Sequence, residues 1–256
     1  MSPSQTPVLA NPAFTKQLSA LAATEIFMAE MDIEQLRNGA EADFCITWLN
    51  ASEQIQFDRF SFEKRRLEWL AGRVSAKRAF VELYRHTRKE DISPDELVIE
   101  ATMSGKPVLH TEKHKEVFKD VDFSISHSHD KAICLACRSR CGIDLQYLSN
   151  TLFKVKYRFC NDVETAMLFD IDADEIRHLG HLWSAKESIR KCLSVRSLLG
   201  FSEINLVRVT QHDVVYCLLF RLDKPIVGNG FISAVTTIVD NYSLAACVIG
   251  SDRLHA

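Results

Sequence analysis

The chain carries at residues 183–191 the stretch Trp183-Ser184-Ala185-Lys186-Glu187-Ser188-Ile189-Arg190-Lys191. This stretch lies within a longer segment, residues 176–193, whose apolar residues recur at helical spacing. In a helix, side chains four residues apart share one face, so Trp183, Glu187 and Lys191 come together. A carboxylate and an ammonium group are therefore expected one turn apart beside an aromatic ring.

A second stretch, Gly142-Ile143-Asp144-Leu145-Gln146, alternates in the way of a β-strand. Side chains two residues apart in a strand point to the same side, so Asp144 and Gln146 are expected on one face. The apolar neighbours of Asp144 make its charge costly unless a cation or a metal ion pairs with it. Two interpretations follow: a structural salt bridge, or a carboxylate that works with Glu187 to hold a hard cation over a phosphate.

Bulk composition is that of an ordinary globular protein. Of the 256 residues, 46% are hydrophobic and 25% are charged, and the formal net charge is -3. The first residues lack the basic and apolar regions of a signal peptide, and no apolar run approaches the ~18 residues that span a bilayer. Eight cysteines without an export signal favour reduced thiols. We therefore expect a cytoplasmic protein that makes no membrane contact.

Three of the cysteines, Cys134, Cys137 and Cys141, imitate the spacing of a metal or redox site. Residues 133–136 have the pattern of a buried strand, in which positions three apart point to opposite faces. No second CxxC and no well-spaced histidine pair complete a four-ligand zinc site. We therefore expect buried thiols here and no zinc.

Positive charge gathers between residues 59 and 89, which hold ten Lys or Arg and three acids. A solvated helix face would explain such a run, and so would a binding site for a multiply charged anion. Nucleic acid is not expected as a partner, because the remainder of the chain is acidic and no nucleic-acid-binding motif accompanies the cluster.

The apolar pattern divides the chain into a tail and two halves. Residues 1–22 are polar and marked by proline, and we expect a flexible tail there. Residues 23–140 are expected to form an N-terminal α/β half and residues 141–256 a C-terminal α/β half. Helices are expected at 61–88, 157–169 and 176–193, and strands at 26–36, 97–102, 122–126, 133–136, 206–210, 214–222, 231–239 and 243–249. The predicted fold class is therefore α/β (α+β), although no internal sequence repeat is visible.

The two stretches quoted first resemble the signatures G-(I/V)-D and W-x-x-K-E-(A/S)-x-x-K of 4'-phosphopantetheinyl transferases of the Sfp type. Three weaker blocks precede them in that family's order: Gly72-Arg73 with Lys77, Gly105-Lys106-Pro107, and Phe123-Ser124-Ile125-Ser126-His127-Ser128. The resemblance covers roughly residues 45–192. It implies two similar α/β halves related by a pseudo-twofold axis, with a cleft between them.

The resemblance also implies an activity, that of a holo-(acyl-carrier-protein) synthase. Such an enzyme moves the 4'-phosphopantetheine arm of coenzyme A onto a serine of an apo acyl or peptidyl carrier protein and releases 3',5'-ADP. Magnesium, the implied cofactor, takes one or two carboxylates plus substrate phosphate oxygens, and we assign Asp144 and Glu187 to it. Gln146 stands where some relatives carry a third acid, and its amide can act through a water. Glu187 is also a candidate acceptor of the serine proton, and Lys191 is the cation for the pyrophosphate or the leaving 3',5'-ADP.

The weaker blocks are assigned to coenzyme A by the same resemblance. A guanidinium group can bind a phosphate through two hydrogen bonds, which favours arginine for the 3'-phosphate. The assigned residues are Arg66 and Arg73 for the 3'-phosphate, Gly105, Lys106 and Pro107 for the adenine end, and Ser126 with His127, whose ring meets a phosphate.

Other assignments stay open at the level of sequence. Lys186 points away from the face of Glu187 and is as readily ordinary surface as functional, whereas Trp183 is expected to pack beneath its helix. A mixed basic and apolar surface for an acidic carrier protein is expected from Arg158, Phe159, Met167 and Phe169. We expect a monomer, since a chain that forms its own cleft needs no partner. The neutral Gln146 motivates one alternative, a catalytically silent relative that binds coenzyme A or a carrier protein.

Overall fold

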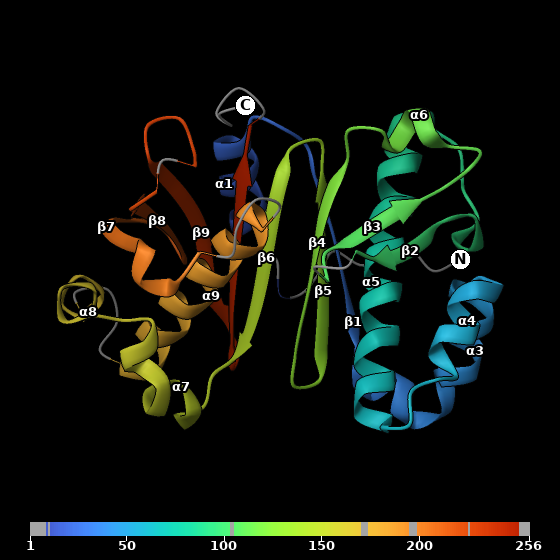
Figure 1. Ribbon diagram of the computed structural model, residues 1–256, viewed down its shortest axis with the longest axis horizontal. Coiled ribbons are helices and arrows are strands. Elements are labelled where there is room, and N and C mark those ends of the chain that lie inside the picture. Colours follow the sequence, from blue (N-terminus) through green and yellow to red (C-terminus); the bar gives the residue numbers. More distant parts are fainter. Residues whose placement is uncertain are drawn as a thin grey trace. The chain divides into compact units, whose positions relative to one another are not determined.

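The computed structural model describes residue 9 and residues 11–102, 105–169, 174–194, 199–224 and 226–250. These residues form two compact units (Figure 1). The first unit contains Phe27–Arg138, and the second contains Leu9–Ile26 and the described residues from Ser139 onward. Each unit combines helices with antiparallel strands, which confirms the predicted α/β (α+β) class. Residues 1–8 of the expected tail and residues 251–256 of the expected C-terminal half lie outside the described residues.

The first unit is built from five strands and a set of helices around one long helix. Its strands are β1 (Ile26–Asp32), β2 (Val98–Ala101), β3 (Pro107–His110), β4 (Asp122–Ser128) and β5 (Lys131–Cys137). Its helices are α2 (Ile33–Gln35), the π-helix η1 (Leu36–Ala40), α3 (Glu41–Trp48), α4 (Ala51–Phe57), α5 (Glu63–Arg88), the 3-10 helix η2 (Pro94–Glu96) and α6 (Lys115–Phe118). One sheet has the order β1-β5-β4, and β2 pairs with β3 separately. Helix α5 packs on β5 and β4 (Figure 1).

One strand of this unit differs from the sequence expectation, whereas its long helix lies where it was expected. The strand β1 ends at Asp32, earlier than expected, because the carboxylate of Asp32 caps α2 and accepts a hydrogen bond of 2.9 Å from Glu34 N. Helix α5 runs without interruption through Gly72, where a Cβ would lie 3.3 Å from Ile125 Cγ2. The missing side chain therefore lets the helix lie close to β4.

The second unit contains one five-stranded antiparallel sheet with the order β6-β10-β9-β8-β7. Its strands are β6 (Arg140–Tyr147), β7 (Ile204–His212), β8 (Val215–Leu222), β9 (Phe231–Val239) and β10 (Tyr242–Ile249). Its helices are α1 (Pro12–Ala22), α7 (Asn150–Val155), the 3-10 helices η3 (Lys156–Arg158) and η4 (Phe201–Glu203), α8 (Asp162–Phe169) and α9 (Glu175–Leu193). Helix α9 packs on β6, β10 and β9.

The close approach of α9 to β6 depends on Gly142. A Cβ at this position would lie 2.6 Å from Cys192 N and closer still to Ser188 O, so any side chain would push the helix away. The glycine of the G-I-D stretch therefore brings the helix of residues 183–191 directly against the strand that carries Asp144.

The expected flexible tail at residues 1–22 is wrong for its described second half. Residues 12–22 form α1, which starts with an Asn11 cap accepting a hydrogen bond of 2.8 Å from Phe14 N. Phe14 and Leu18 are buried, and α1 contacts β10, β9 and β8 of the second unit's sheet. Apolar residues four apart give this short segment a face to bury, which offsets its polar composition.

Apart from α1 and α6, the two units follow one order of elements: a strand, short helices, a long helix, a 3-10 turn and then four strands. This repetition agrees with the two similar halves that the family resemblance implied, whereas the pseudo-twofold axis and the cleft stay predictions. Among the described residues, no helix has both the length and the apolar composition that crossing a bilayer requires.

Candidate active site

Asp144 lies in the middle of β6 and is 7% exposed. The side chain of Lys191 reaches it from α9: Lys191 Nζ lies 2.8 Å from Asp144 Oδ1 and donates to Ile143 O at 3.0 Å. Asp144 thus forms the ion pair that the salt-bridge interpretation expects, whereas its assignment to a metal ion stays a prediction. The same contact also brings together two of the three residues assigned to catalysis.

Glu187 faces the same strand from one turn earlier on α9. Burial raises the pKa of the Glu187 carboxyl, the charge of Asp144 raises it further, and Arg190 and Lys191 oppose the shift. Because the charge of Asp144 acts on the Glu187 carboxyl, the two side chains are electrostatic neighbours. The ion pair of Glu187 runs to Arg190, whose Nη1 lies 2.6 Å from Glu187 Oε1. Sequence spacing had suggested Lys191 as its helical partner.

Gln146 follows Asp144 by two residues on the same face of β6. Its amide donates a hydrogen bond of 2.7 Å from Nε2 to Tyr147 O. Among the described residues, no three His, Cys, Asp or Glu side chains come together as a metal-binding group. Asp144 and Glu187 nevertheless fit Mg²⁺, which takes one or two protein carboxylates and completes its shell with water and substrate phosphates.

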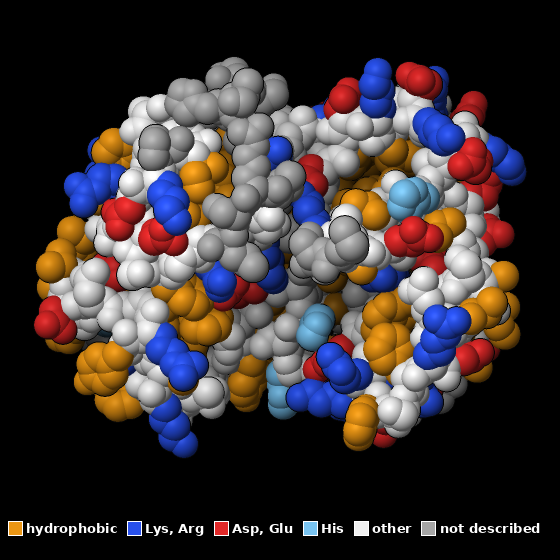
Figure 2. All heavy atoms as spheres, viewed as in Figure 1, with side chains coloured by type: hydrophobic (Ala, Val, Ile, Leu, Met, Phe, Trp, Pro, Cys, Tyr) orange, Lys and Arg blue, Asp and Glu red, His pale blue; other side chains and the backbone are white. Residues whose placement is uncertain are grey.

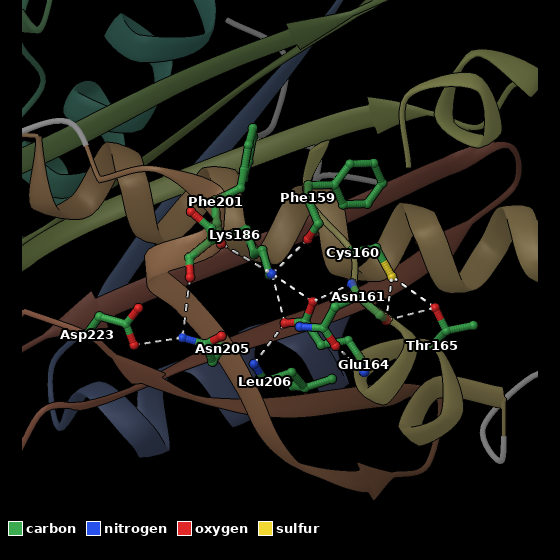
Figure 3. A network of polar contacts seen from close by, with 11 residues as sticks. Phe159, Cys160, Asn161, Glu164, Thr165, Lys186, Phe201, Asn205, Leu206 and Asp223 are labelled. Atoms are coloured by element: carbon green, nitrogen blue, oxygen red, sulfur yellow. Dashed lines mark hydrogen bonds and ion pairs between the residues drawn. The ribbon is translucent and has the colours of Figure 1, made fainter. Parts of the chain in front are cut away.

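Lys186 is not ordinary surface, because only 2% of it is exposed. Its Nζ donates to Phe159 O at 2.7 Å and lies 2.8 Å from Glu164 Oε1 (Figure 3). Glu164 in turn caps α8: its backbone N donates to Asn161 Oδ1 at 2.9 Å, and its Oε2 accepts from Asn161 N at 3.2 Å. Lys186 therefore fixes α9 in the second unit, while the adjacent Glu187 remains at the site.

Trp183 packs as expected. Its ring meets Phe159 edge to face at a centroid distance of 5.0 Å and lies 5.1 Å from Phe201. The Asn-x-x-Glu pattern at residues 161–164, typical of a helix start, was the signal that could have located this cluster. It also explains why the helix expected at 157–169 begins again at Asp162 as α8.

The first unit contains a matching buried pair, Lys77 with Glu53, and both side chains are fully buried. Lys77 Nζ donates to Trp48 O at 2.6 Å, and Glu53 forms a capping box with Asn50. Glu53 Oε1 accepts from Ile99 N at 3.0 Å in this unit. Glu164 Oε1 accepts from Leu206 N at 2.9 Å in the other. Lys77, which the family resemblance placed in one of the weaker blocks, thus has a structural role in the first unit that Lys186 repeats in the second.

The residues assigned to the adenine end of coenzyme A form a turn before β3. Gly105 has a φ of 82°, in the left-handed region that favours glycine. Lys106 Nζ lies 2.8 Å from Asp122 Oδ1, and Pro107 is the first residue of β3. Two residues of this turn, Met103 and Ser104, lie outside the described residues. Contact of the turn with coenzyme A stays a prediction.

The arginines assigned to the 3'-phosphate both have partners within the first unit. Arg66 Nε lies 2.7 Å from Glu41 Oε1. Arg73 is 8% exposed, lies over the Trp69 ring at 4.6 Å and approaches Glu53 Oε1 at 3.9 Å. Burial lowers the pKa of Arg73 to about 10. A phosphate bound here would therefore have to compete with these contacts, and the assignment stays a prediction.

Ser126 and His127 lie at the end of β4, where their exposures differ. Ser126 is buried, whereas the His127 side chain is 48% exposed and its Nδ1 lies 4.0 Å from Glu68 Oε1. Of this pair, His127 is the one that an external phosphate can reach directly.

Most of each unit matches a known protein family. Residues 38–139 match the family described as 4'-phosphopantetheinyl transferase, N-terminal. Residues 140–247 match the 4'-phosphopantetheinyl transferase superfamily. The boundary between the two matches lies next to the change of unit between Arg138 and Ser139. The class defined by the fold and the site is thus that of enzymes that transfer phosphopantetheine.

Individual relatives agree with this class. A holo-(acyl-carrier-protein) synthase of Bacillus pumilus is 38% identical over 84 residues, which are 33% of this chain and 67% of the relative. One of Staphylococcus saprophyticus is 33% identical over 85 residues, 33% of this chain and 69% of the relative. The chain belongs to the 4'-phosphopantetheinyl transferase superfamily.

Solved structures similar to part of the chain carry the same names. A holo-ACP-synthase from Plasmodium yoelii is 19% identical with a TM-score of 0.36, covering 44% of this chain and 91% of that one. A holo-(acyl-carrier-protein) synthase from Bacillus anthracis in complex with CoA (3',5'-ADP) is 22% identical with a TM-score of 0.36, covering 44% of this chain and 92% of that one.

Proposed function

We propose that this transferase moves the 4'-phosphopantetheine arm of coenzyme A to a serine of an apo carrier protein, releases 3',5'-ADP, and is a magnesium-dependent enzyme of the Sfp type. The observation that carries the proposal is the grouping of Asp144, Glu187 and Lys191 where α9 meets β6. The Sfp type is supported by the length of the chain, since the two bacterial relatives match only 33% of it. A further unit, matched by the N-terminal family model, precedes the one that holds the site.

Asp144 and Glu187 would hold the magnesium ion, with Gln146 contributing through a water. The bound ion would neutralise the phosphate oxygens on which negative charge gathers during transfer. This donor set brings two negative charges from the protein, because an amide brings none. The remaining ligands must therefore come from water and from the coenzyme's diphosphate.

The chain's own residues account for the rest of the step. The serine oxygen of the carrier attacks the phosphorus that bears the pantetheine, and the bond from that phosphorus to the oxygen of 3',5'-ADP breaks. Glu187 takes the serine proton, directly or through a water, and burial and Asp144 raise its pKa in a direction that suits a base. Lys191 donates to the diphosphate and so stabilises the leaving 3',5'-ADP.

The carrier protein is proposed to dock on α7, η3 and α8. Phe153, Tyr157, Val163 and Phe169 are 46%, 84%, 63% and 66% exposed, so four large apolar side chains of this one segment are open to solvent. Figure 2 shows Lys or Arg side chains beside hydrophobic ones where Figure 1 places these helices, at the lower left. A mixed basic and apolar surface complements an acidic helical partner. Phe159 is wrong as a member of this surface, because it is 3% exposed and belongs to the core.

A cytoplasmic location and a monomeric state are part of the same proposal. None of the eight cysteines, all of which lie among the described residues, forms a disulfide, as expected for a protein of a reducing compartment.

Intact-mass spectrometry tests the proposed function. The protein is incubated with an apo carrier protein, coenzyme A and magnesium, and the carrier should gain the mass of one phosphopantetheine group. Omission of magnesium with added chelator should prevent the gain. A panel of carriers from fatty acid, polyketide and peptide synthesis would identify the preferred partner by rate. If no carrier gains mass with any divalent metal, the silent alternative replaces this proposal.

A further inference from the structure

Two consecutive basic residues of helix α9 form ion pairs with the two carboxylates that are proposed to bind the metal ion. Arg190 Nη1 lies 2.6 Å from Glu187 Oε1, and Lys191 Nζ lies 2.8 Å from Asp144 Oδ1. Lys191 has a role in the proposed transfer, through the diphosphate. Arg190 has none, although it contacts the carboxylate that is proposed both to bind the metal and to accept the proton.

Arg190 is held in place by more than this ion pair. Its Nε donates to Leu199 O at 2.8 Å, and its guanidinium group lies over the Phe201 ring at 4.6 Å from the centroid. Its side chain is 22% exposed and that of Glu187 is 20% exposed, so water screens their interaction only in part. A guanidinium group fixed by three contacts stays beside Glu187 and does not sample many positions.

The formal charges of the four side chains sum to zero. Asp144 and Glu187 bring two negative charges, and Arg190 and Lys191 bring two positive ones. Gln146, two residues after Asp144 on β6, is uncharged. A divalent cation that approaches the free protein therefore meets no net negative charge, and Arg190 repels it from the position next to Glu187. A diphosphate would supply the missing negative charge.

We propose that Arg190 makes binding of the divalent cation depend on the diphosphate of coenzyme A, so that the free protein holds the ion weakly and the complex with coenzyme A holds it tightly. This inference rests on the proposed function, because it names the same metal site. By linkage, the cation strengthens binding of coenzyme A by the same factor. The arginine thus acts as a positioning and specificity residue that favours the metal complex of the diphosphate over the free metal.

Binding of Mn²⁺ gives a readout that does not depend on turnover. Mn²⁺ is titrated by electron paramagnetic resonance into the free protein, into the protein with coenzyme A, and into the protein with 3',5'-ADP, which lacks the diphosphate. We expect coenzyme A to strengthen Mn²⁺ binding by about tenfold or more, because each negative charge that the diphosphate places a few ångströms from a divalent ion is worth that much even in water. We expect 3',5'-ADP to give less than half of that factor.

Variants assign the effect to Arg190. Arg190→Met removes the charge and keeps an apolar stem on Phe201, so Mn²⁺ should bind the free protein more tightly. In the complex with coenzyme A the diphosphate already offsets that charge, so Mn²⁺ binding there should change less and the factor should fall to about threefold or less. Arg190→Lys keeps the charge and should keep the factor. Arg221→Met, which removes an exposed arginine from β8 of the same unit, is the matched control and should leave the factor unchanged. Gln146→Glu adds a negative charge at the site and should lower the factor without touching Arg190.

The outcomes separate this inference from the proposed function. Equal Mn²⁺ affinity with and without coenzyme A in a wild-type protein that modifies its carrier overturns the role of Arg190 alone. An unchanged factor in Arg190→Met, or loss of Mn²⁺ binding by a variant with a native circular dichroism spectrum, also overturns it. If Arg190→Met does not fold, Gln146→Glu decides, and an unchanged factor there is the contrary result. Absence of carrier modification by the wild-type protein overturns the proposed function itself.

Discussion

Replacement of Lys186 by methionine should destabilise the protein without removing any group from the proposed chemistry. Lys186 and Glu164 are 2% and 1% exposed, and the ammonium group contacts Glu164 and the carbonyl of Phe159. Removal of one member of a buried ion pair leaves the other charge uncompensated, which costs about 3 to 5 kcal/mol. At about 2 to 4 °C per kcal/mol for a chain of this size, the midpoint of thermal unfolding should fall by about 6 to 20 °C.

Calorimetry measures this loss, and two further variants show its cause. The double variant Lys186→Met with Glu164→Gln should recover part of the lost stability, because it no longer buries an unpaired carboxylate. Lys154→Met, which removes an exposed lysine of α7, should change stability by no more than about 0.5 kcal/mol. A loss below about 1 kcal/mol for Lys186→Met, or a double variant less stable than the single one, would refute the reasoning.

Four other expectations concern activity and pH. Asp144→Ala and Glu187→Gln should each reduce transfer below detection by intact mass while circular dichroism stays native, and near-normal turnover of Asp144→Ala would contradict the metal assignment. Gln146→Glu should lower the magnesium concentration for half-maximal rate, and an unchanged requirement would place Gln146 away from the ion. Tyr157→Ala should raise the KM for the carrier severalfold with little change in kcat, and equal KM values would argue for another docking surface. The pKa of Glu187 in the folded protein is raised above 4.5, so between these two pKa values the folded state binds more protons than the unfolded state. The contribution of Glu187 to the free energy of unfolding should therefore decline as the pH rises from 4.5 through the raised pKa. Glu187→Gln should remove that slope from denaturant titrations, and an identical slope would contradict the shift.

The architecture of the second unit could be predicted well from the sequence. Its strands show clear apolar runs, and the observed β7 to β10 overlap the four segments expected there. The helical face of Glu187 and Lys191 and the strand face of Asp144 also follow from simple periodicity. The packing of that helix on that strand could not be predicted from the sequence. The structure shows that it depends on Gly142, because Cys192 of the helix occupies the space that a side chain at this position would need.

The partners of the charged groups could not be predicted. On a helix, positions three and four apart are both neighbours, so the sequence allows Glu187 to pair with Arg190 or with Lys191. The structure selects Arg190, because Lys191 extends to Asp144 on a strand that is distant in the sequence. The burial of Lys186 could not be predicted either, because lysine is rarely buried unless paired and its partner Glu164 lies on another helix.

The repeated structure of the two units was also hidden, because it rests on few residues. Asn50 with Glu53 and Asn161 with Glu164 are helix caps of the same kind, and each glutamate holds a buried lysine of the long helix. Similarity confined to such widely spaced positions does not register as a sequence repeat. The pairs nevertheless align the two long helices at one position, with Lys77 of α5 equivalent to Lys186 of α9.

This alignment explains why the proposed metal chemistry belongs to one unit. The residue after the buried lysine is Glu187 in the second unit and Arg78 in the first. Arg78 donates to Glu30 O on β1 at 3.0 Å and lies over the rings of Phe44 and Trp48. A guanidinium group is always a cation and cannot ligate a metal ion, so the equivalent position of the first unit serves packing. The exchange of an acid for an arginine at one helical position thus leaves the first unit without the equivalent of the proposed metal ligand Glu187.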